Sequence, residues 1–207
     1  ALLEQTVEDD AGGAVLVAGE SGVGKSRLKR EVWADAVRRG FRTVEGQGLS
    51  NGGQPFQIWR EVLKGLLLGI RVDAAEATVL SSVITDIEAV LGASVEQGLE
   101  FDASAMHARF IDVAHRIVRR VKRPTLLVLE DLQWARSESL TLLRTIEDSL
   151  ADVPVLIFAT YRDDEASAFI HGLDTASHIE LQRLGRSDIR EVAGHTISAE
   201  QVDRGLV

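Results

Sequence analysis

Short apolar runs alternate with amphipathic stretches along most of this chain. Continuous apolar runs bounded by glycine, proline or charged residues predict buried strands. Apolar positions that recur every three or four residues predict helices that cover those strands. The expected strands are 14–18, 41–47, 125–131, 153–162 and 178–184, and the expected helices are 25–39, 55–68, 105–121 and 137–150, with another from 187. Residues 70–103 contain apolar positions without clear element boundaries.

The alternation of strands and helices indicates an α/β fold with a mostly parallel sheet. Parallel strands need crossover connections, which are right-handed and place helices on the faces of the sheet. In the helix over 25–39, we expect Leu28, Val32 and Val37 on the buried side. The sequence therefore predicts three layers, with the sheet between two layers of helices.

Composition and charge narrow the class of protein. Among the 207 residues, 45% are hydrophobic and 27% are charged, and no apolar run approaches the ~20 residues that cross a bilayer, so we expect no membrane association. The acidic start lacks the segments of a signal peptide, and the absence of cysteine suits a cytoplasmic protein. A net charge of −9 argues against direct nucleic-acid binding by this chain. The basic run over 119–123 is interpreted as a helix end that complements the macrodipole, rather than as a nucleic-acid patch.

The segment GESGVGKS, Gly19 to Ser26, matches the pattern G-x-x-x-x-G-K-[ST] between a predicted strand and a predicted helix. Its glycines allow backbone N–H groups to curl around a phosphate, because no Cβ blocks the approach. We expect Lys25 to reach the β- and γ-phosphates and the Ser26 hydroxyl to bind Mg²⁺. The predicted phosphate-binding residues are Gly19, Glu20, Ser21, Gly22, Val23, Gly24, Lys25, Ser26 and Arg27. An ordinary glycine-rich turn is the alternative.

Paired carboxylates follow the apolar run LLVL, at Glu130 and Asp131. Ligands of open α/β sheets bind beyond the carboxyl ends of the strands, so these acids are expected to face the phosphates. Glu130 would hold Mg²⁺ through its water shell, and Asp131 would orient or deprotonate the attacking water. The alternative is that the two acids merely end a strand. The long stretch between Lys25 and Glu130 leaves room for an additional strand, which favours the ATPase division over kinases and GTPases.

The strand over 153–162 ends in ATYR, with Thr160 and Arg162 at its carboxyl end. A cation at this position lies one strand away from the acids and could sense a γ-phosphate. The alternative is a surface arginine that pairs with Asp163 or Asp164.

Taken together, GESGVGKSRL, LLVLEDLQWARSESLTLL and ATYRDDE resemble the AAA-type P-loop ATPase module of the STAND class. This module occurs in large LuxR-family transcriptional regulators and related multidomain signalling proteins. The resemblance covers about 12–184 and implies a five-stranded sheet of order 5-1-4-3-2, ATP or ADP with Mg²⁺ as ligands, and Thr160 and Arg162 as a sensor. Two departures stand out: Gln133 and Arg136 replace the histidine and aspartate of H-W-A-D, and Glu130 replaces an acid that is commonly aspartate.

The resemblance also implies a function, a nucleotide-controlled switch in a larger signalling or transcription-regulating protein. Slow ATP hydrolysis would reset the switch. Its partners would be the nucleotide, sensor and effector domains of the same longer chain, and other copies in nucleotide-dependent self-association. Residues 1–184 would form the ATPase core and 185–207 the start of a helical lid, with an adenine-contacting segment expected before Ala1. The alternatives are a turnover ATPase, such as a motor or loader acting on nucleic acid or protein, and a scaffold with a vestigial site.

Overall fold

The computed structural model describes residues 2–8, 11–50, 53–95, 102–165, 170, 173 and 176–183. Within them, five strands form one sheet: β1 (Gly13–Gly19), β2 (Arg42–Gln47), β3 (Thr125–Glu130), β4 (Val155–Thr160) and β5 (Ser177–Leu181). All neighbouring strands are parallel, and their order is β2-β3-β4-β1-β5. This order is the predicted 5-1-4-3-2 read from the other edge, so the predicted fold is confirmed. In space, β4 lies between β1, which leads into the glycine-rich loop, and β3, which ends at the paired acids Glu130 and Asp131.

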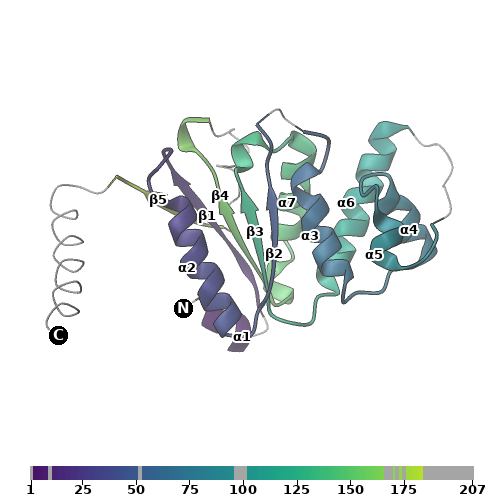
Figure 1. Ribbon diagram of the computed structural model, residues 1–207, viewed down its shortest axis with the longest axis horizontal. Helices are drawn as coiled ribbons and strands as arrows, with labels where there is room; N and C mark the ends of the chain where they lie inside the picture. The colour runs from purple at the N-terminus through teal and green to yellow at the C-terminus, as the bar shows by residue number, and fades with distance from the viewer. Residues whose placement is uncertain are drawn as a thin grey trace, which may run out of the picture.

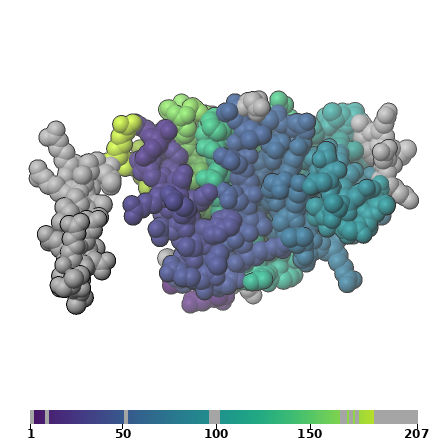
Figure 2. All heavy atoms as spheres, viewed as in Figure 1, coloured from purple at the N-terminus to yellow at the C-terminus, as the bar shows by residue number. Residues whose placement is uncertain are grey.

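Helices cover both faces of this sheet (Figure 1). On one face lie α1 (Leu2–Glu8) and α2 (Lys25–Arg38), and on the other lie α3 (Gln57–Leu67), α6 (Ala103–Arg119) and α7 (Ser137–Glu147). Two short helices, α4 (Ala74–Ser81) and α5 (Ile87–Leu91), pack outside against α6 and α3. In the space-filling view, the first half of the chain, coloured purple to blue, covers most of the visible face (Figure 2).

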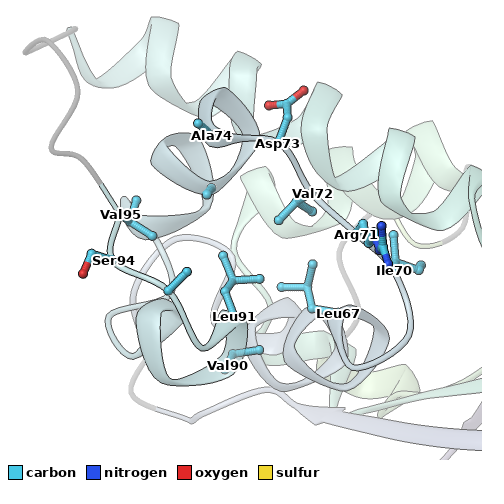
Figure 3. A pocket seen from close by; sticks show the side chains of 12 residues that line it. Leu67, Ile70, Arg71, Val72, Asp73, Ala74, Val90, Leu91, Ser94 and Val95 are labelled. Carbon is cyan, nitrogen blue, oxygen red and sulfur yellow. The ribbon is translucent and has the colours of Figure 1, made fainter.

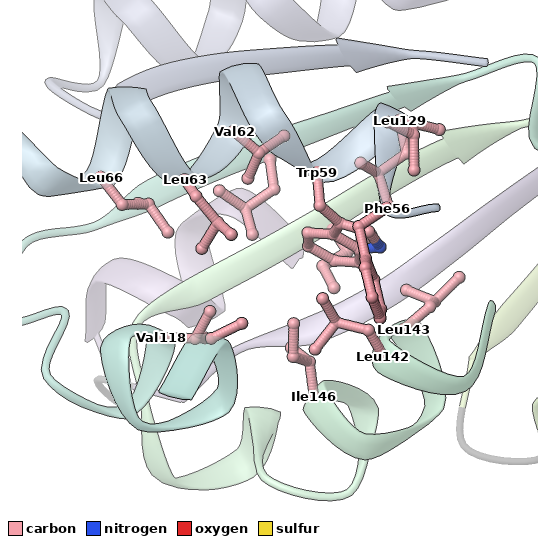
Figure 4. Close-up of a cluster of buried hydrophobic side chains, with 14 of the residues drawn as sticks. Phe56, Trp59, Val62, Leu63, Leu66, Val118, Leu129, Leu142, Leu143 and Ile146 are labelled. Carbon is pink, nitrogen blue, oxygen red and sulfur yellow. The ribbon is translucent and has the colours of Figure 1, made fainter. Parts of the chain in front are cut away.

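The pleat of β3 explains why its sequence is apolar without interruption. Leu127 and Leu129 belong to the core under α3, α6 and α7, whereas Leu126 and Val128 belong to the core under α1 and α2. A strand covered on both faces needs apolar side chains at every position. Figure 4 shows the larger core, where the buried Trp59 of α3 packs among leucines and isoleucine of α7. The indole N–H of Trp59 donates to the Ser139 carbonyl oxygen at 2.9 Å, which ties α3 to α7.

The structure corrects several details of the sequence-based elements. Val37 was expected on the buried side of α2, but it is 53% exposed, and Ala36 is buried in its place. Consecutive side chains on a helix are rotated by about 100° relative to each other. The buried face of α2 therefore includes position 36 but not position 37. The sequence did not indicate α1. It also left α4 and α5 unassigned, although α4 begins with a capping box between Asp73 and Glu76.

Two other expectations concern the C-terminal residues and membrane-spanning helices. The helix expected from residue 187, and with it the domain boundary at 184–185, lies outside the described residues. Among the described helices, none is both long and apolar enough to span a bilayer.

Candidate phosphate-binding site

The loop between β1 and α2 is shaped by three glycines. Gly22 and Gly24 have φ of 80° and 112°, a region that side chains bearing a Cβ rarely adopt. Gly19 also has a positive φ, of 154°, and in addition a Cβ there would lie 2.8 Å from the Leu181 carbonyl oxygen of β5. The loop then enters the 14-residue helix α2 at Lys25. Backbone N–H groups at a helix N-terminus attract anions, so this loop has the geometry of a phosphate cradle.

The Lys25 side chain folds back over this loop. Its ammonium donates to the carbonyl oxygens of Gly19, at 2.5 Å, and of Glu20, at 2.8 Å. Burial of the ammonium, and secondarily the nearby Arg162 guanidinium, lower the pKa of Lys25 from its ordinary value. An anion beside Lys25 would offset both effects. The lysine is therefore held in reach of the cradle by neutral partners that a phosphate oxygen can replace.

A cleft of about 400 Å³ opens in front of the loop. Its lining includes four cations and a single carboxylate, a charge balance that suits a polyphosphate. The described residues that line it are Ser21, Gly22, Gly24, Lys25, Ser26, Arg27, Arg30, Asp131, Trp134 and Arg162. Of the predicted loop residues, Gly19, Glu20 and Val23 shape the loop without lining this cleft. Exposed Glu20 pairs instead with Arg183 beyond β5, at 2.6 Å.

Sequence reasoning missed two residues of the cleft, Arg30 and Trp134. Arg30 follows Ser26 by one helical turn, and its Nε donates to the Ser26 carbonyl oxygen at 3.3 Å. Helical spacing from the loop could therefore have identified it. Trp134 follows Asp131 by three residues, in the 3₁₀ turn Leu132–Trp134 that comes after β3. Only the path of that turn brings the indole to the phosphate cradle.

Asp131 stands at the cleft in a left-handed backbone conformation, with φ of 58° and ψ of 47°. Its carboxylate accepts hydrogen bonds from Gln47 Nε2 at 3.2 Å and from Gln133 Nε2 at 3.3 Å. The Asp131 backbone is also packed closely against Gly48, because a Cβ at Gly48 would lie only 2.4 Å from the Asp131 carbonyl oxygen. A non-glycine residue held in this conformation is a feature that clusters at functional sites.

Thr160 and Arg162 are brought to Asp131 by the neighbouring strand β4. Thr160 is buried, and its hydroxyl accepts the backbone N–H of Asp131 at 3.4 Å, so its place is beneath the cleft. Gln133, at the position where the resembled family has histidine, connects both groups. Its amide donates to the Asp131 carboxylate, and its Oε1 accepts the backbone N–H of Arg162 at 3.0 Å.

The Arg162 guanidinium has features of both sequence-based readings. It lines the cleft, and its Nε is buried without a hydrogen-bond partner among the described residues. Its terminal nitrogens pair with Glu165 at 2.6 Å and with Asp164 at 3.6 Å. Trp134 donates to the same Glu165 carboxylate at 3.2 Å. The arginine is thus a cleft residue whose charge is shared with an acidic turn.

The Glu130 carboxylate points to a different neighbour, Lys29 of α2. Lys29 Nζ donates to Glu130 at 2.7 Å and to Glu45 of β2 at 2.8 Å. Burial and the neighbouring Glu45 carboxyl raise the pKa of Glu130, whereas the pKa of Glu45 is lowered, first by its interaction with the Glu130 carboxyl and then by Lys29. Burial lowers the pKa of Lys29, but its bonds to Glu130 and Glu45 outweigh that effect and leave it raised. Lys29 and Glu45 were not identified from the sequence, although Lys29 follows Lys25 by one helical turn.

The available oxygens can be tested against a divalent cation. Within the part of the chain that the structure describes, no group of three or more His, Cys, Asp or Glu side chains gathers as a metal site. Mg²⁺ is usually held by one or two carboxylates together with substrate phosphates and water. Of the two predicted Mg²⁺ ligands, Ser26 lines the cleft together with Asp131, whereas Glu130 does not line it and bonds to Lys29 instead. Ser26 and Asp131 supply a hydroxyl and a carboxylate that fit Mg²⁺ arriving with a nucleotide.

A separate cavity of about 490 Å³ lies between the end of α3 and the helices α4 and α5 (Figure 3). Leu67, Val72 and Leu91 point into it, and apolar side chains make up most of its lining. Among the described residues that line it, the one carboxylate is that of Asp73, which already accepts the Glu76 backbone N–H at 2.8 Å. None of the described residues of the sequence motifs lines this cavity, which is therefore separate from the cleft in front of the loop.

Comparisons with known proteins agree with this geometry. A family model described as "AAA ATPase domain" matches residues 1–158. No curated protein matches the chain. Among solved structures, a structure of Drosophila ORC bound to DNA is similar with a TM-score of 0.53 at 16% identity, over 99% of this chain and 46% of that one. The Aeropyrum pernix ORC1 protein in complex with DNA is similar with a TM-score of 0.50 at 11% identity, over 96% of this chain and 47% of that one. The chain thus spans less than half the length of these proteins, and at such identities the likeness concerns the fold.

Proposed function

The chain belongs to the AAA ATPase domain family, and from this premise we propose that it is an ATP- and Mg²⁺-binding switch. The switch would operate within a larger signalling protein, with transcription regulation as its output and slow ATP hydrolysis as its reset. One observation carries the proposal: the cationic cleft that joins the phosphate cradle to Asp131 and Arg162. We further propose that residues 1–184 form the ATPase core, that 185–207 begin a helical lid, and that copies associate in response to nucleotide.

The site residues predicted from the sequence have the following roles in this proposal. The loop N–H groups bind the β-phosphate, and Lys25 and Arg162 balance the charge of the γ-phosphate. Asp131, fixed by Gln47 and Gln133, orients or deprotonates the attacking water. Ser26 and Glu130 would hold Mg²⁺, which when bound neutralises charge on the phosphate oxygens.

Thr160 is a positioning residue in this proposal, because its hydroxyl accepts the Asp131 N–H and it does not line the cleft. Its role would be to fix the position of the Asp131 backbone relative to the phosphate-binding loop. This assignment differs from the sequence-based one, in which Thr160 acted directly in the sensor.

Replacing Arg162 by alanine is expected to reduce the preference for ATP over ADP by roughly tenfold, the effect of one charge-assisted hydrogen bond. Calorimetry with both nucleotides measures the ratio of affinities. The matched variant Glu165→Gln removes the closest ion-pair partner of Arg162 and leaves the guanidinium in place, so it should preserve that preference. If Arg162→Ala leaves the ratio of ATP to ADP affinities unchanged, Arg162 does not sense the γ-phosphate and only forms ion pairs with Glu165 and Asp164.

The second candidate function is a turnover ATPase that acts on nucleic acid, and one feature favours it. A pocket of about 470 Å³ at the amino ends of β2 and β3 is lined by Arg42, Arg120, Lys122 and Arg123. Arg120 pairs with Glu76, but no carboxylate among the described residues pairs with the other three cations. The similar ORC structures hold DNA, so they give no support to the expectation that this chain avoids nucleic acid.

The two functions differ in their response to DNA. For the switch, we expect a labelled DNA duplex neither to bind at physiological salt nor to stimulate hydrolysis. Fluorescence anisotropy of the duplex and steady-state phosphate release measure the two effects. Binding that weakens steeply with salt, and that is lost in a Lys122→Gln, Arg123→Gln double variant but kept in Lys64→Gln, would favour the turnover ATPase.

A further inference from the structure

A half-buried ion-pair cluster lies beneath α2, next to the phosphate cleft. The Lys29 ammonium bridges Glu130 of β3 and Glu45 of β2, at 2.7 and 2.8 Å. The side chains of Lys29 and Glu130 are only 17% and 15% exposed, whereas that of Glu45 is 37% exposed. Charge-assisted hydrogen bonds at this depth are stronger than those between exposed groups, so the cluster fixes the direction of the Glu130 carboxylate.

The register of the sheet explains why these three groups meet. Gln47 pairs with Glu130, so Glu45, two residues earlier on β2, lies on the same face of the sheet as Glu130. That face is covered by α2, whose Lys29 follows Lys25 by one turn. Ser26 begins the same helix and lines the cleft, but Glu130 does not. Lys29 bonds to Oε1 of Glu130, so turning this oxygen toward Ser26 would break that bond.

The two carboxylates compete for one ammonium. Each hydrogen bond that Lys29 gives to Glu45 leaves less of its positive charge for Glu130. If Glu45 were neutral, Lys29 would hold Glu130 more firmly. If Lys29 were neutral, Glu130 would lose its partner and would be repelled by Glu45 toward the cleft.

We propose that Lys29 is a positioning residue that holds Glu130 away from the Mg²⁺ of a bound nucleotide, and that Glu45 weakens this hold. The inference rests on the proposed function, because Glu130 is the residue to which Mg²⁺ binding is assigned there. Binding of Mg²⁺ with nucleotide then requires the exchange of Glu130 from Lys29 to the metal's hydration shell. Glu45 remains as the partner that keeps Lys29 neutralised after the exchange.

This arrangement gives two substitutions with opposite effects on the Mg²⁺ requirement. Lys29→Met keeps the length of the side chain and removes its charge, so the Mg²⁺ concentration for half-maximal binding of mant-ADP should fall, by roughly tenfold. Glu45→Gln keeps the shape and removes the competitor, so the same concentration should rise, by roughly threefold to tenfold. In EDTA, both variants should bind mant-ADP as the wild-type chain does.

The experiment is a titration of Mg²⁺ into the 207-residue chain with mant-ADP, followed by fluorescence, so that it does not depend on turnover. Lys64→Met is the matched control, because Lys64 also bridges two carboxylates, Glu61 at 2.9 Å and Asp86 at 2.8 Å, far from the cleft. It should leave the Mg²⁺ dependence unchanged. The double variant of Lys29 and Glu45 should resemble Lys29→Met, since without the ammonium there is nothing for Glu45 to compete for.

Thermal unfolding of each variant separates positioning from folding, and the isosteric Glu45→Gln keeps the test decisive if Lys29→Met is unstable. Shifts of the Mg²⁺ requirement in the same direction, or no shift in either variant, would overturn the positioning role while the wild-type chain still binds Mg²⁺ and mant-ADP. A wild-type chain whose mant-ADP binding does not respond to Mg²⁺ would overturn both this inference and the proposed function.

Discussion

Lys25→Ala is expected to abolish measurable ATP binding, with the Kd raised by roughly 100-fold or more. The cleft holds three other cations, but only Lys25 has its ammonium fixed above the loop, through the carbonyl oxygens of Gly19 and Glu20. Backbone N–H groups carry partial charges and cannot balance the γ-phosphate alone. Calorimetry with ATP and ADP on the variant and the wild-type chain measures this loss.

Two controls give this result its meaning. Lys122→Ala removes the same charge from the opposite end of the sheet and should leave the affinity for ATP unchanged. Because Lys25 also bonds to its own loop, thermal unfolding of Lys25→Ala checks that the fold persists. Wild-type affinity in a folded Lys25→Ala chain would remove this lysine from phosphate binding and weaken the assignment of the cleft.

The second large effect is expected from Asp131→Asn, which should keep ATP bound while hydrolysis falls by ~10²–10⁴-fold, the range that a general base contributes. An asparagine has almost the same shape. Gln133 can still donate to its amide oxygen, and Gln47 can turn its own amide to accept from the asparagine NH₂ group. The asparagine cannot accept the proton of the attacking water. Single-turnover hydrolysis with ATP in excess of its Kd separates this loss from any change in binding.

Comparison with Glu130→Gln tests whether the two acids divide their roles. That variant removes the negative charge assigned to Mg²⁺, so it should raise the Mg²⁺ requirement more than it slows saturated hydrolysis. Asp112→Asn, on the exposed side of α6 and paired with Arg116, is a control for the loss of one carboxylate. Equal losses of ATP binding in Asp131→Asn and Glu130→Gln would show that the division of roles is wrong.

Local sequence was sufficient for the fold class and for the conformation of the glycine-rich loop. The glycine positions, the lysine and the flanking apolar strand are adjacent in the chain, so their geometry depends on short-range conformational preferences. Gly22 and Gly24 adopt the positive φ that their lack of a Cβ permits. The strand order also followed, although through the resemblance to a family rather than through periodicity. The sequence did not predict α4 and α5, because the apolar positions in that part of the chain recur without a clear period.

Other features depended on contacts between distant parts of the chain, and no local pattern contains them. Lys29 and Glu130 are 101 positions apart, and their ion pair exists because α2 covers the face of the sheet on which β2 and β3 align their acids. The sequence identified Glu130 as an acid at a strand end, but the packing of a helix determined that its carboxylate faces an ammonium. Thr160 reaches Asp131 by the same kind of long-range register, through neighbouring parallel strands. The sequence by itself determined the glycine-rich loop and the fold class that carries it, because those preferences are local. Tertiary structure decided that Lys29 meets Glu130 and that Gln47 meets Asp131, because those partners are distant in sequence and come together only through packing.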